Sequence, residues 1–477
     1  MSPTRRRWPY VLLALCLIWF ASAFWQAGKP LPPGVGVAMS WRSVEKVDFL
    51  ADLTYVDAAG TRYSEQEIFD TAFEMIRRSR KLVVLDMFLF NDFAAAPDAA
   101  LRPLSSELTQ ALLHRMRAVP GLRVVVISDP INTVYGGTAS THLEVLERAG
   151  AQVVLTDLSA LRASNPLWSG PWALCCGWLG NNAAGGWLPN PFGTEKITLR
   201  SWLALPNFRA NHRKTLVVDA GESWQALVTS ANPHDASAAH GNVALRFSGA
   251  AALDVLHTEA AVAAFSDKPL TAFPAADDIR VETGPRLRVL TEGAIGRALM
   301  DTVEAAASGE TLDVAVFYLS HRGLIHALKA AHARGVTVRV LLDPNEDAFG
   351  RKKNGVPNRQ VAHELSAAGI PLRWCDTHGE QCHAKVLLHR GAQEATLIAG
   401  SANFTRRNLD DLNLETSVQL RASEDHPAIT DAAQWFETNW ANEPSRRFST
   451  DYATYADTAL LRRAWYRIGE AAGLSTW

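Results

Sequence analysis

Two segments of the sequence place a histidine and a lysine two residues apart, and these residues are well suited to chemistry. The segments read NHRKTLVVD and QCHAKVLLH, and their pairs are His212 with Lys214 and His383 with Lys385. Side chains two apart in an extended strand project from the same face. Each imidazole, a nucleophile or proton carrier, can therefore act on an anion that the nearby ammonium group holds. We expect the fold to bring the two pairs together.

A turn that contains asparagine follows each segment at the same distance. Asn232 ends the first turn, Ser-Ala-Asn, and Asn403 ends the second, Gly-Ser-Ala-Asn, each 20 residues after its own histidine. One His-x-Lys pattern is a weak signal, because short motifs recur by chance. The same pattern repeated with the same offset indicates a duplicated site.

The elements that must position these residues alternate between amphipathic helices and apolar strands. The stretches TLVV and VLL after the two lysines are typical of strands that enter a buried sheet. The pattern in the first half predicts helices at 65–80, 104–118 and 142–149 and strands at 82–90, 122–130 and 152–155. Such an alternation predicts an α/β fold.

The second half of the chain replays this order. It predicts helices at 294–307, 323–334 and 361–368 and strands at 311–319, 336–344 and 371–374. The strand that ends in ISDP is matched by one that ends in LLDP. We infer an internal duplication whose copies pack about a pseudo-two-fold axis, as the subunits of an isologous dimer do. His212 would then face His383 across one cleft.

The duplication and the composition of the remaining segments divide the chain into six parts. They are a signal anchor or signal peptide at 1–27, a linker at 28–43, a first repeat domain at 44–262 with a tryptophan-rich insertion at about 160–205, a linker at 263–285, a second repeat domain at 286–445 and a helical tail at 446–477.

The N-terminus is typical of a membrane-targeting segment. Arg5 to Arg7 precede an uncharged apolar run from Trp8 to Trp25. We favour a signal anchor that keeps the arginines in the cytoplasm and the catalytic body outside it, on the periplasmic side in a Gram-negative cell. The alternative is a secreted protein, released by cleavage near Ala23 in the sequence Ala-Ser-Ala.

Composition bounds the possible partners. The 477 residues are 48% apolar and 20% charged, and the net charge of -2 argues against a general polyanion binder, so no nucleic acid is expected. No His/Cys cluster suggests a metal. In an oxidising compartment Cys375 and Cys382 would close a short loop before His383, or they remain free buried thiols. Cys175 and Cys176 are uninformative.

The duplicated pattern resembles the phospholipase D superfamily, whose signature is H-x-K-x4-D followed by a G/S-x-N turn. The resemblance covers about Glu65 to Arg421 and implies two α-β-α sandwich domains around a pseudo-two-fold axis. It implies no cofactor. The catalytic residues it implies are His212, Lys214, Asp219, His383, Lys385 and Glu415. The phosphate-binding residues it implies are Lys214, Asn232, Lys385, Ser401 and Asn403.

The sequence departs from the family pattern in both copies. In the second copy Arg390 stands where the aspartate is expected, and Glu415 falls where the family places an acid that orients the histidine, in this copy His383. The first copy has Ala244 at the corresponding offset, and Asp235 is a candidate substitute for the missing acid.

The resemblance implies exchange of a phosphodiester through a covalent intermediate. One imidazole attacks phosphorus while the other protonates the leaving alkoxide and later deprotonates water or an alcohol. Lysines and asparagine amides would hold the non-bridging oxygens. We favour His212 as the nucleophile because its motif is complete, with His383 as acid and base. The reverse order stays open, because Glu415 would raise the basicity of His383.

Three segments outside the repeats favour a lipid substrate at a membrane. Five of the 15 tryptophans lie between Trp168 and Trp202, and tryptophan favours the bilayer interface, although an ordinary packed lid has the same composition. The segment Leu460 to Leu474 is expected to lie on anionic headgroups or to pack on the second domain. The polar and basic loop from Asp343 to Arg359 either guides a phosphate or is simply solvated.

The sequence thus predicts a monomeric phosphodiesterase or phosphatidyltransferase that acts on membrane glycerophospholipids, with water or an alcohol as acceptor. Hydrolysis of the phospholipase D kind and transfer of the cardiolipin synthase kind both remain open. The first alternative is an exported endonuclease of the same superfamily. The second is a degenerate protein that binds lipid or phosphate without turnover.

Overall fold

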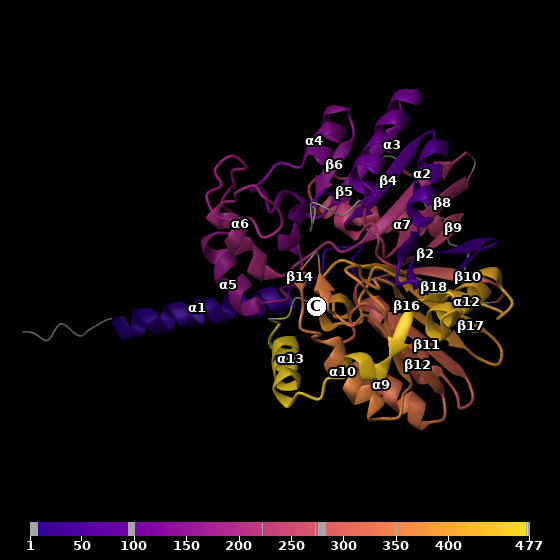
Figure 1. Ribbon diagram of the computed structural model, residues 1–477. Helices are drawn as coiled ribbons and strands as arrows, with labels where there is room; N and C mark the ends of the chain where they lie inside the picture. Colours follow the sequence, from indigo (N-terminus) through magenta and orange to yellow (C-terminus); the bar gives the residue numbers. More distant parts are fainter. Residues whose placement is uncertain are drawn as a thin grey trace, which may run out of the picture.

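The chain folds as a mixed α/β protein with two large sheets (Figure 1). The computed structural model describes residues 8–93, 101–221, 223–271, 273–274, 283–348, 351–473 and 475. Arg5 to Arg7 and the middle of the predicted linker at 263–285 lie outside the described residues. Within the described part of the chain each sheet has nine strands.

The first sheet comes mainly from the N-terminal half. Its order is β19-β2-β9-β8-β7-β4-β5-β6, with β3 paired to β2. β4, β5 and β6 are parallel, and β7 runs antiparallel to β4. The strands are β2 (Val47–Asp57), β3 (Arg62–Glu65), β4 (Leu82–Met87), β5 (Arg123–Ser128), β6 (Gln152–Leu155), β7 (Lys214–Ala220), β8 (Ser223–Thr229), β9 (Asn242–Ser248) and β19 (Arg446–Arg447).

The second sheet comes mainly from the C-terminal half. Its order is β1-β10-β18-β17-β16-β11-β12-β15-β20, and a separate hairpin pairs β13 with β14. The strands are β1 (Arg42–Ser43), β10 (Arg286–Thr291), β11 (Thr311–Val316), β12 (Thr337–Leu342), β13 (Asp347–Ala348), β14 (Arg351–Lys352), β15 (Leu372–Cys375), β16 (Lys385–Arg390), β17 (Ala395–Gly400), β18 (Thr416–Ala422) and β20 (Ser449–Asp451).

Strand order confirms the predicted duplication. The run β2-β9-β8-β7-β4-β5-β6 in the first sheet is matched, strand for strand, by β10-β18-β17-β16-β11-β12-β15 in the second. The halves also exchange edge strands, because β1 pairs with β10 and β19 pairs with β2. β1 lies in the predicted linker at 28–43, and β19 lies in the predicted tail at 446–477. Each sheet is therefore completed by a strand from the other end of the chain.

Amphipathic helices cover the outer face of each sheet. α2 buries Ile68, Phe69, Ala72, Met75 and Ile76, spaced to form one apolar stripe. The helices on the first sheet are α2 (Ile68–Arg78), α3 (Leu104–Ala118) and α4 (Thr141–Arg148). Those on the second are α8 (Gly293–Ala305), α9 (Arg322–Ala333) and α10 (Asn358–Ser366).

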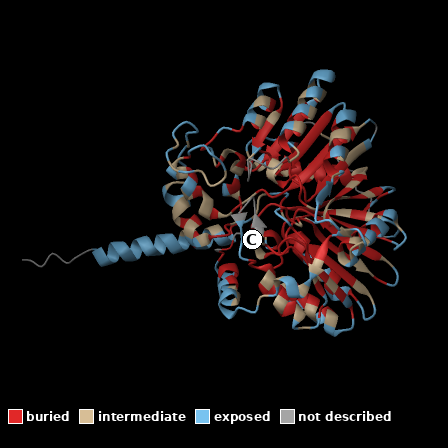
Figure 2. Cartoon of the chain, in the orientation of Figure 1, coloured by how far each residue is buried: buried red, intermediate tan, exposed pale blue. Residues whose placement is uncertain are grey.

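The central core is shared between the repeats. It joins side chains of both sheets, such as Val217 and Val418, with α7 (Ala250–Phe265) and α12 (Pro427–Ala441). α12 follows the second repeat but packs its Trp435 ring 5.8 Å from Phe49 of β2 in the first. Figure 2 shows the buried residues concentrated in both sheets and between them. Neither repeat alone supplies all the side chains of this central core.

Helices α1, α5, α6 and α13 lie outside the duplicated core on one side of the molecule (Figure 1). α1 (Trp8–Gly28) projects from the body and is long and apolar enough to cross a membrane, a test that a signal sequence also passes. α5 (Pro166–Cys175) belongs, with α6 (Leu199–Ala204), to the tryptophan-rich insertion. α13 (Leu460–Ala472) ends the chain, and Leu474 lies outside the described residues.

The predicted elements and the observed ones differ mainly at their ends. The predicted helix at 65–80 begins at Ile68 because Glu65 belongs to β3. The predicted strands at 82–90 and 311–319 stop at Met87 and Val316, where the chain leaves each sheet.

Both cysteine pairs outside α1 form disulfides. The bridge between Cys375 and Cys382, one of two open alternatives, closes the loop before His383. Cys175 and Cys176 are also bonded to each other.

A buried ion-pair network joins the repeats next to the first histidine. Arg213 has no exposed side-chain surface and lies 2.8 Å from Glu292 of the second repeat and 3.4 Å from Glu259 of α7. Glu292 also accepts the backbone N–H of Glu415 at 3.0 Å. A buried carboxylate is stable only when it is paired with a cation. Arg213 is therefore needed to stabilise both Glu259 and Glu292 in the interior.

The variant Arg213→Met should destabilise the protein, because it leaves two buried carboxylates without their cation. We expect a loss of about 3–5 kcal/mol, measured as a lower midpoint in urea unfolding. The exposed pair between Arg77 and Glu74 on α2 supplies the control. Arg77→Met should change stability by less than about 1 kcal/mol. Equal losses for both variants would show that the buried network is not a structural requirement.

Candidate active site

Each histidine lies on a short segment that forms a backbone hydrogen bond to the other repeat. His212 precedes β7, and its backbone N–H donates to the carbonyl of Leu414 in the second repeat at 2.9 Å. His383 precedes β16, and its N–H donates to the carbonyl of Gly241 in the first repeat at 2.7 Å. Because these bonds cross between the repeats, their interface fixes both histidines in one place.

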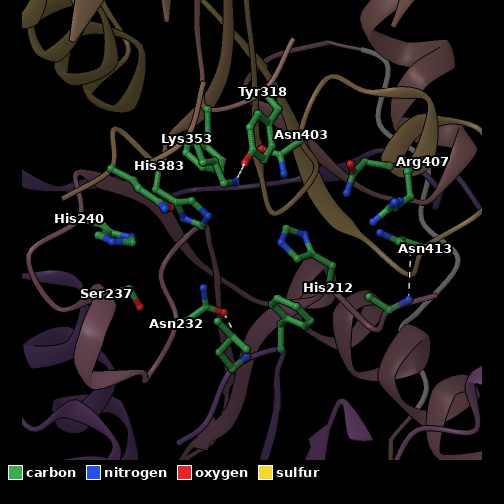
Figure 3. A pocket seen from close by; sticks show the side chains of 16 residues that line it. His212, Asn232, Ser237, His240, Tyr318, Lys353, His383, Asn403, Arg407 and Asn413 are labelled. Carbon is green, nitrogen blue, oxygen red and sulfur yellow. Dashed lines mark hydrogen bonds between the residues drawn. The ribbon is translucent and has the colours of Figure 1, made fainter. Parts of the chain in front are cut away.

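A cavity of about 210 Å³ lies at this interface. His212 and His383 project into it from opposite sides, as expected for residues related by the duplication (Figure 3). The first repeat also contributes Phe88, Leu89, Ala210, Asn232, Ser237 and His240, and the second contributes Phe317, Tyr318, Lys353, Gln381, Asn403, Arg407, Asn408 and Asn413.

Glu415 orients the histidine of the other repeat. Its buried carboxylate lies 2.8 Å from Nδ1 of His212 and also accepts hydrogen bonds from Ser401 and Asn408. Donation of Nδ1–H to a carboxylate leaves the lone pair of Nε2 for a substrate. The prediction that Glu415 orients His383 is wrong. The residue before β18 pairs with the segment before β7, so the acid crosses the interface.

Asn242 occupies the corresponding position beside His383. Its amide oxygen lies 3.1 Å from Nδ1 of that imidazole. Constant spacing from the histidine pointed to Ala244, but the loop between turn and strand is two residues shorter in the first repeat than in the second. The equivalent residue is therefore Asn242. A neutral amide thus orients one histidine and a carboxylate orients the other.

Asp235 does not substitute for an orienting acid. Its carboxylate accepts the backbone N–H and the hydroxyl of Ser105 at 3.0 and 2.6 Å. It therefore anchors the start of α3.

A serine in each asparagine-containing turn holds the orienting group. Ser230 donates to the amide oxygen of Asn242 at 3.0 Å, and Ser401 donates to Glu415. Ser401 was expected to bind phosphate, but its side chain is fully buried and does not line the cavity. Its hydroxyl contacts the carboxylate that orients His212.

The two lysines lie behind aromatic rings, and neither lines the cavity. Lys214 Nζ donates to the carbonyl of His212 at 2.7 Å and lies 5.1 Å from the centre of the Phe88 ring. Lys385 donates to the carbonyl of His383 and lies 5.5 Å from the Phe317 ring. Both side chains are buried, so their charges act on the site with little screening by water.

The two asparagines line the cavity from opposite repeats (Figure 3). The amide oxygen of Asn232 accepts the backbone N–H of Leu89 at 3.3 Å, which leaves its NH₂ group for a ligand. The amide oxygen of Asn403 is buried without a hydrogen-bond partner among the described residues. The arrangement places two imidazoles and two amides around one cavity.

A family model described as "Cardiolipin synthase, PLD-like domain" matches residues 300–440. That interval contains His383, Lys385, Asn403 and Glu415. The match lies within the second repeat and supports the resemblance of the chain to the phospholipase D superfamily. A comparison with curated proteins finds no match.

Solved structures show where the fold recurs. The chain is similar to phosphatidylserine synthase from Haemophilus influenzae, with a TM-score of 0.57 and 11% identity over 95% of this chain and 98% of that one. It is also similar to polyphosphate kinase from Porphyromonas gingivalis (TM-score 0.47, 13% identity, 90% of this chain), of which it spans about half, 54%. Nuc from Salmonella typhimurium, a phospholipase D family member, matches 34% of this chain and 99% of its own at 21% identity, with a TM-score of 0.28.

Asp219, the aspartate of the superfamily signature, stabilises the fold away from the cavity. The Asp219 carboxylate lies at the far end of β7 and accepts the backbone N–H groups of Arg80, Lys81 and Leu82 at 2.7–3.1 Å. It does not line the cavity. Arg390, at the equivalent position, lies 3.4 Å from Asp313. The departure from the signature at Arg390 therefore lies away from the reacting groups.

Two aspartates missed as site residues fix the approach to the histidines. Asp129 accepts the backbone N–H of Asn211 at 2.7 Å, and Asp343 accepts that of Cys382 at 2.8 Å. Burial raises the pKa of each carboxyl to about 7. They are the aspartates of the matched ISDP and LLDP sequences. The repeated Asp-Pro pair, which indicated the duplication, could therefore also have identified these two aspartates as site residues.

Three further residues of the cavity were also missed. His240 lies with its ring centre 5.7 Å from that of His383. Lys353 donates to the hydroxyl of Tyr318, so part of the predicted basic loop does reach the cavity. Arg407 lines it from the second repeat and stacks 5.2 Å from the Phe208 ring. No repeated pattern marked these residues, because each is present in one repeat alone.

Burial keeps both histidines neutral. It lowers the pKa of His212 to about 4, against the opposing effect of Glu415. It lowers the pKa of His383 well below its ordinary value, with a further contribution from Lys385. Burial also lowers the pKa of Lys214 to about 7. A neutral imidazole has the lone pair that nucleophilic attack requires.

Replacement of Glu415 by Gln should lower kcat on a phosphodiester by roughly 10²–10⁴-fold, because the imidazole loses the carboxylate that fixes its tautomer and balances its charge. Glu310 supplies a matched control, since it lies 2.8 Å from His389 outside the cavity. Glu310→Gln should leave kcat unchanged. Steady-state rates on a chromogenic phosphodiester give the comparison, and equal rates for Glu415→Gln and the unmodified chain would contradict the assigned role.

The free enzyme should show a bell-shaped dependence of kcat/KM on pH. Below about pH 4 the His212 imidazole binds a proton and loses its lone pair, so the rate falls with acid. The rate also falls with rising pH as His383 loses the proton it must donate, because burial holds its pKa well below the ordinary value. Above about pH 7 Lys214 loses its charge as well, so it binds phosphate less tightly. Rates between pH 3 and 9 measure both limbs. A profile that is flat through pH 4 and 7 would refute the assignment.

Proposed function

We propose that the protein is a phosphodiesterase or phosphatidyltransferase that acts on glycerophospholipids through a phosphohistidine intermediate. The observation that carries the proposal is the pair of imidazoles on opposite sides of one cavity, with Glu415 behind His212. A reaction with two half-reactions at one phosphorus atom needs one group that acts as the nucleophile and a second that transfers protons.

In the first half-reaction Nε2 of His212 attacks phosphorus, and a P–N bond forms while the P–O bond to the leaving alcohol breaks. His383 gives its proton to the departing oxygen. Its pKa is low in the empty site, but a bound phosphate anion favours the protonated imidazole. The positive charge on the phosphorylated His212 is balanced by Glu415, 2.8 Å from its other nitrogen.

In the second half-reaction water or an alcohol attacks the phosphohistidine. His383 takes the proton of the incoming oxygen, and the P–N bond breaks to regenerate both imidazoles. Lys214 and Lys385 hold negative charge on the non-bridging oxygens, and the NH₂ groups of Asn232 and Asn403 donate to the same oxygens. The choice between hydrolysis and transfer then depends on which acceptor enters the cavity.

The difference between the two orienting groups supports His212 as the nucleophile. Its partner is a carboxylate, which stabilises the cationic phosphohistidine, whereas the partner of His383 is the neutral amide of Asn242. The carboxylate favours a histidine that carries positive charge for the lifetime of an intermediate. The amide suits one that exchanges a proton in each step.

A phospholipid is the substrate class that fits the rest of the chain. The matching family model is described as a cardiolipin synthase domain, and the solved phosphatidylserine synthase shares the fold. The apolar helix α1 would hold the body at a membrane. We place that body outside the cytoplasm, with cleavage near Ala23 as the alternative to an anchor. Both half-sites lie in one chain, so a monomer suffices.

Turnover is tested with purified full-length protein and mixed vesicles of phosphatidylglycerol and phosphatidylethanolamine, with and without glycerol. Mass spectrometry follows the lipids and the peptides that contain His212 and His383. We expect phosphatidic acid if water is the acceptor, or exchanged and doubled lipids if an alcohol is. A phosphatidyl adduct is expected on His212. Loss of turnover in His212→Ala and its retention in His114→Ala, a change at an exposed helix position, complete the comparison.

Two outcomes would overturn the proposal. Cleavage of DNA in a parallel sample without lipid turnover would make the protein a nuclease of the same superfamily. No reaction with either substrate would make it a binding protein without turnover. An adduct on His383 alone would keep the reaction and reverse the roles of the histidines.

A further inference from the structure

The C-terminal helix α13 presents a large apolar face to solvent. Leu460, Leu461, Trp465 and Ile468 are 77%, 87%, 62% and 58% exposed. Their spacing places them on one side of the helix, while Tyr466, Gly469 and Glu470 on the other side are buried. A soluble surface rarely leaves four large apolar side chains together in water, so this face is expected to have an apolar partner.

The end of α13 meets the apolar helix α1. A cavity of about 460 Å³ is lined by Arg406 together with residues of three helices, namely Phe20, Ala23, Phe24 and Ala27 of α1, Pro166 and Leu167 of α5, and Ala471 and Ala472 of α13. Figure 1 shows α13 running across the direction of α1 on the side from which α1 projects. The exposed face of α13 therefore lies beside the base of a helix that is apolar enough to span a bilayer.

The tryptophan-rich insertion flanks α1 as well. The indole N–H of Trp19 donates to the carbonyl of Leu167 at 2.8 Å, and the Ser22 hydroxyl donates to that of Gly170 at 2.9 Å. Large apolar side chains of the insertion are also exposed to solvent. They include Leu167, Leu174, Trp178 and Trp187, which are 53%, 51%, 73% and 63% exposed.

The length of α1 decides where a bilayer would reach. Its 21 residues rise about 31 Å, and the hydrocarbon core of a bilayer is about 30 Å thick. The part that projects freely, before Trp19, is only half of that length. A bilayer that holds all of α1 must therefore extend past Trp19 to the level of α5 and the end of α13.

The arginines of α13 are also consistent with a helix that lies at the bilayer surface. Arg462, Arg463 and Arg467 belong to the helix whose apolar face is exposed, and Arg462 and Arg467 keep 53% and 41% of their side chains in solvent. An interfacial helix has apolar residues that enter the acyl region and basic residues that remain among anionic headgroups.

We propose that α13 and the insertion at 160–205 form a bilayer-docking surface that enters the outer half of the membrane beside α1. The partner is an anionic lipid bilayer. Residues adjacent in the sequence line the two cavities, since Arg406 lines the one beside α1 and Arg407 lines the one that holds the histidines. The docking surface is independent of turnover, so its test does not depend on the proposed reaction.

Spin labels on the full-length protein test the proposal. Cys16, the free thiol among the described cysteines, is first replaced by Ser. Leu461→Cys and Ile468→Cys then carry nitroxide labels in vesicles of phosphatidylcholine and phosphatidylglycerol. Arg77→Cys on α2, with 68% of the arginine side chain exposed, is the matched control away from α1.

Labels at 461 and 468 should collide with oxygen more often than with a water-soluble nickel complex, because they lie among acyl chains. The order should be reversed at 77. Nickel access at 461 and 468 equal to that at 77 would overturn the proposal. Dipolar broadening between labels at 461 would also overturn it, because it would identify a second copy of the chain as the partner. Labels sit at exposed positions, so folding is not at issue.

Discussion

The site depends on hydrogen bonds that cross between the repeats. His212 and His383 each bond through the backbone to the opposite repeat, and each imidazole is oriented by a side chain of that repeat. A repeat folded by itself would have its histidine but no group to fix the proton on Nδ1. The duplication therefore supplies two histidines and also the groups that orient them. The buried contact between Arg213 and Glu292 stabilises the same interface.

The two halves of the site have become different while the fold has stayed symmetric. Strand order, the lysine beneath each aromatic ring and the aspartate after each parallel strand are matched in both repeats. The orienting group is not, since Glu415 faces one imidazole and Asn242 the other. A symmetric scaffold with unlike partners gives the two imidazoles different electrostatic surroundings. This asymmetry suits the proposed reaction, in which the nucleophile and the proton carrier are different histidines.

Much of the fold followed from periodicity, because helices and strands of the repeats bury one face or both and so have regular apolar patterns. The helix at 104–118 and the strand at 152–155 were predicted at their observed bounds. The orienting residues could not be predicted in this way. Their partners depend on which segments meet across the interface, and a loop shorter by two residues moved the equivalent position from Ala244 to Asn242. Arg407 and His240 have no counterpart in the other repeat, so no comparison within the sequence marked them.

The position of Glu415 late in the chain bears on how such a protein is made. A ribosome adds this residue after all of the first repeat and most of the second. Until β18 is complete, His212 has no carboxylate behind it, and its segment has no Leu414 carbonyl to bond. A growing chain would thus lack an assembled site. The order of synthesis alone would delay any chemistry at the site until the chain is nearly complete.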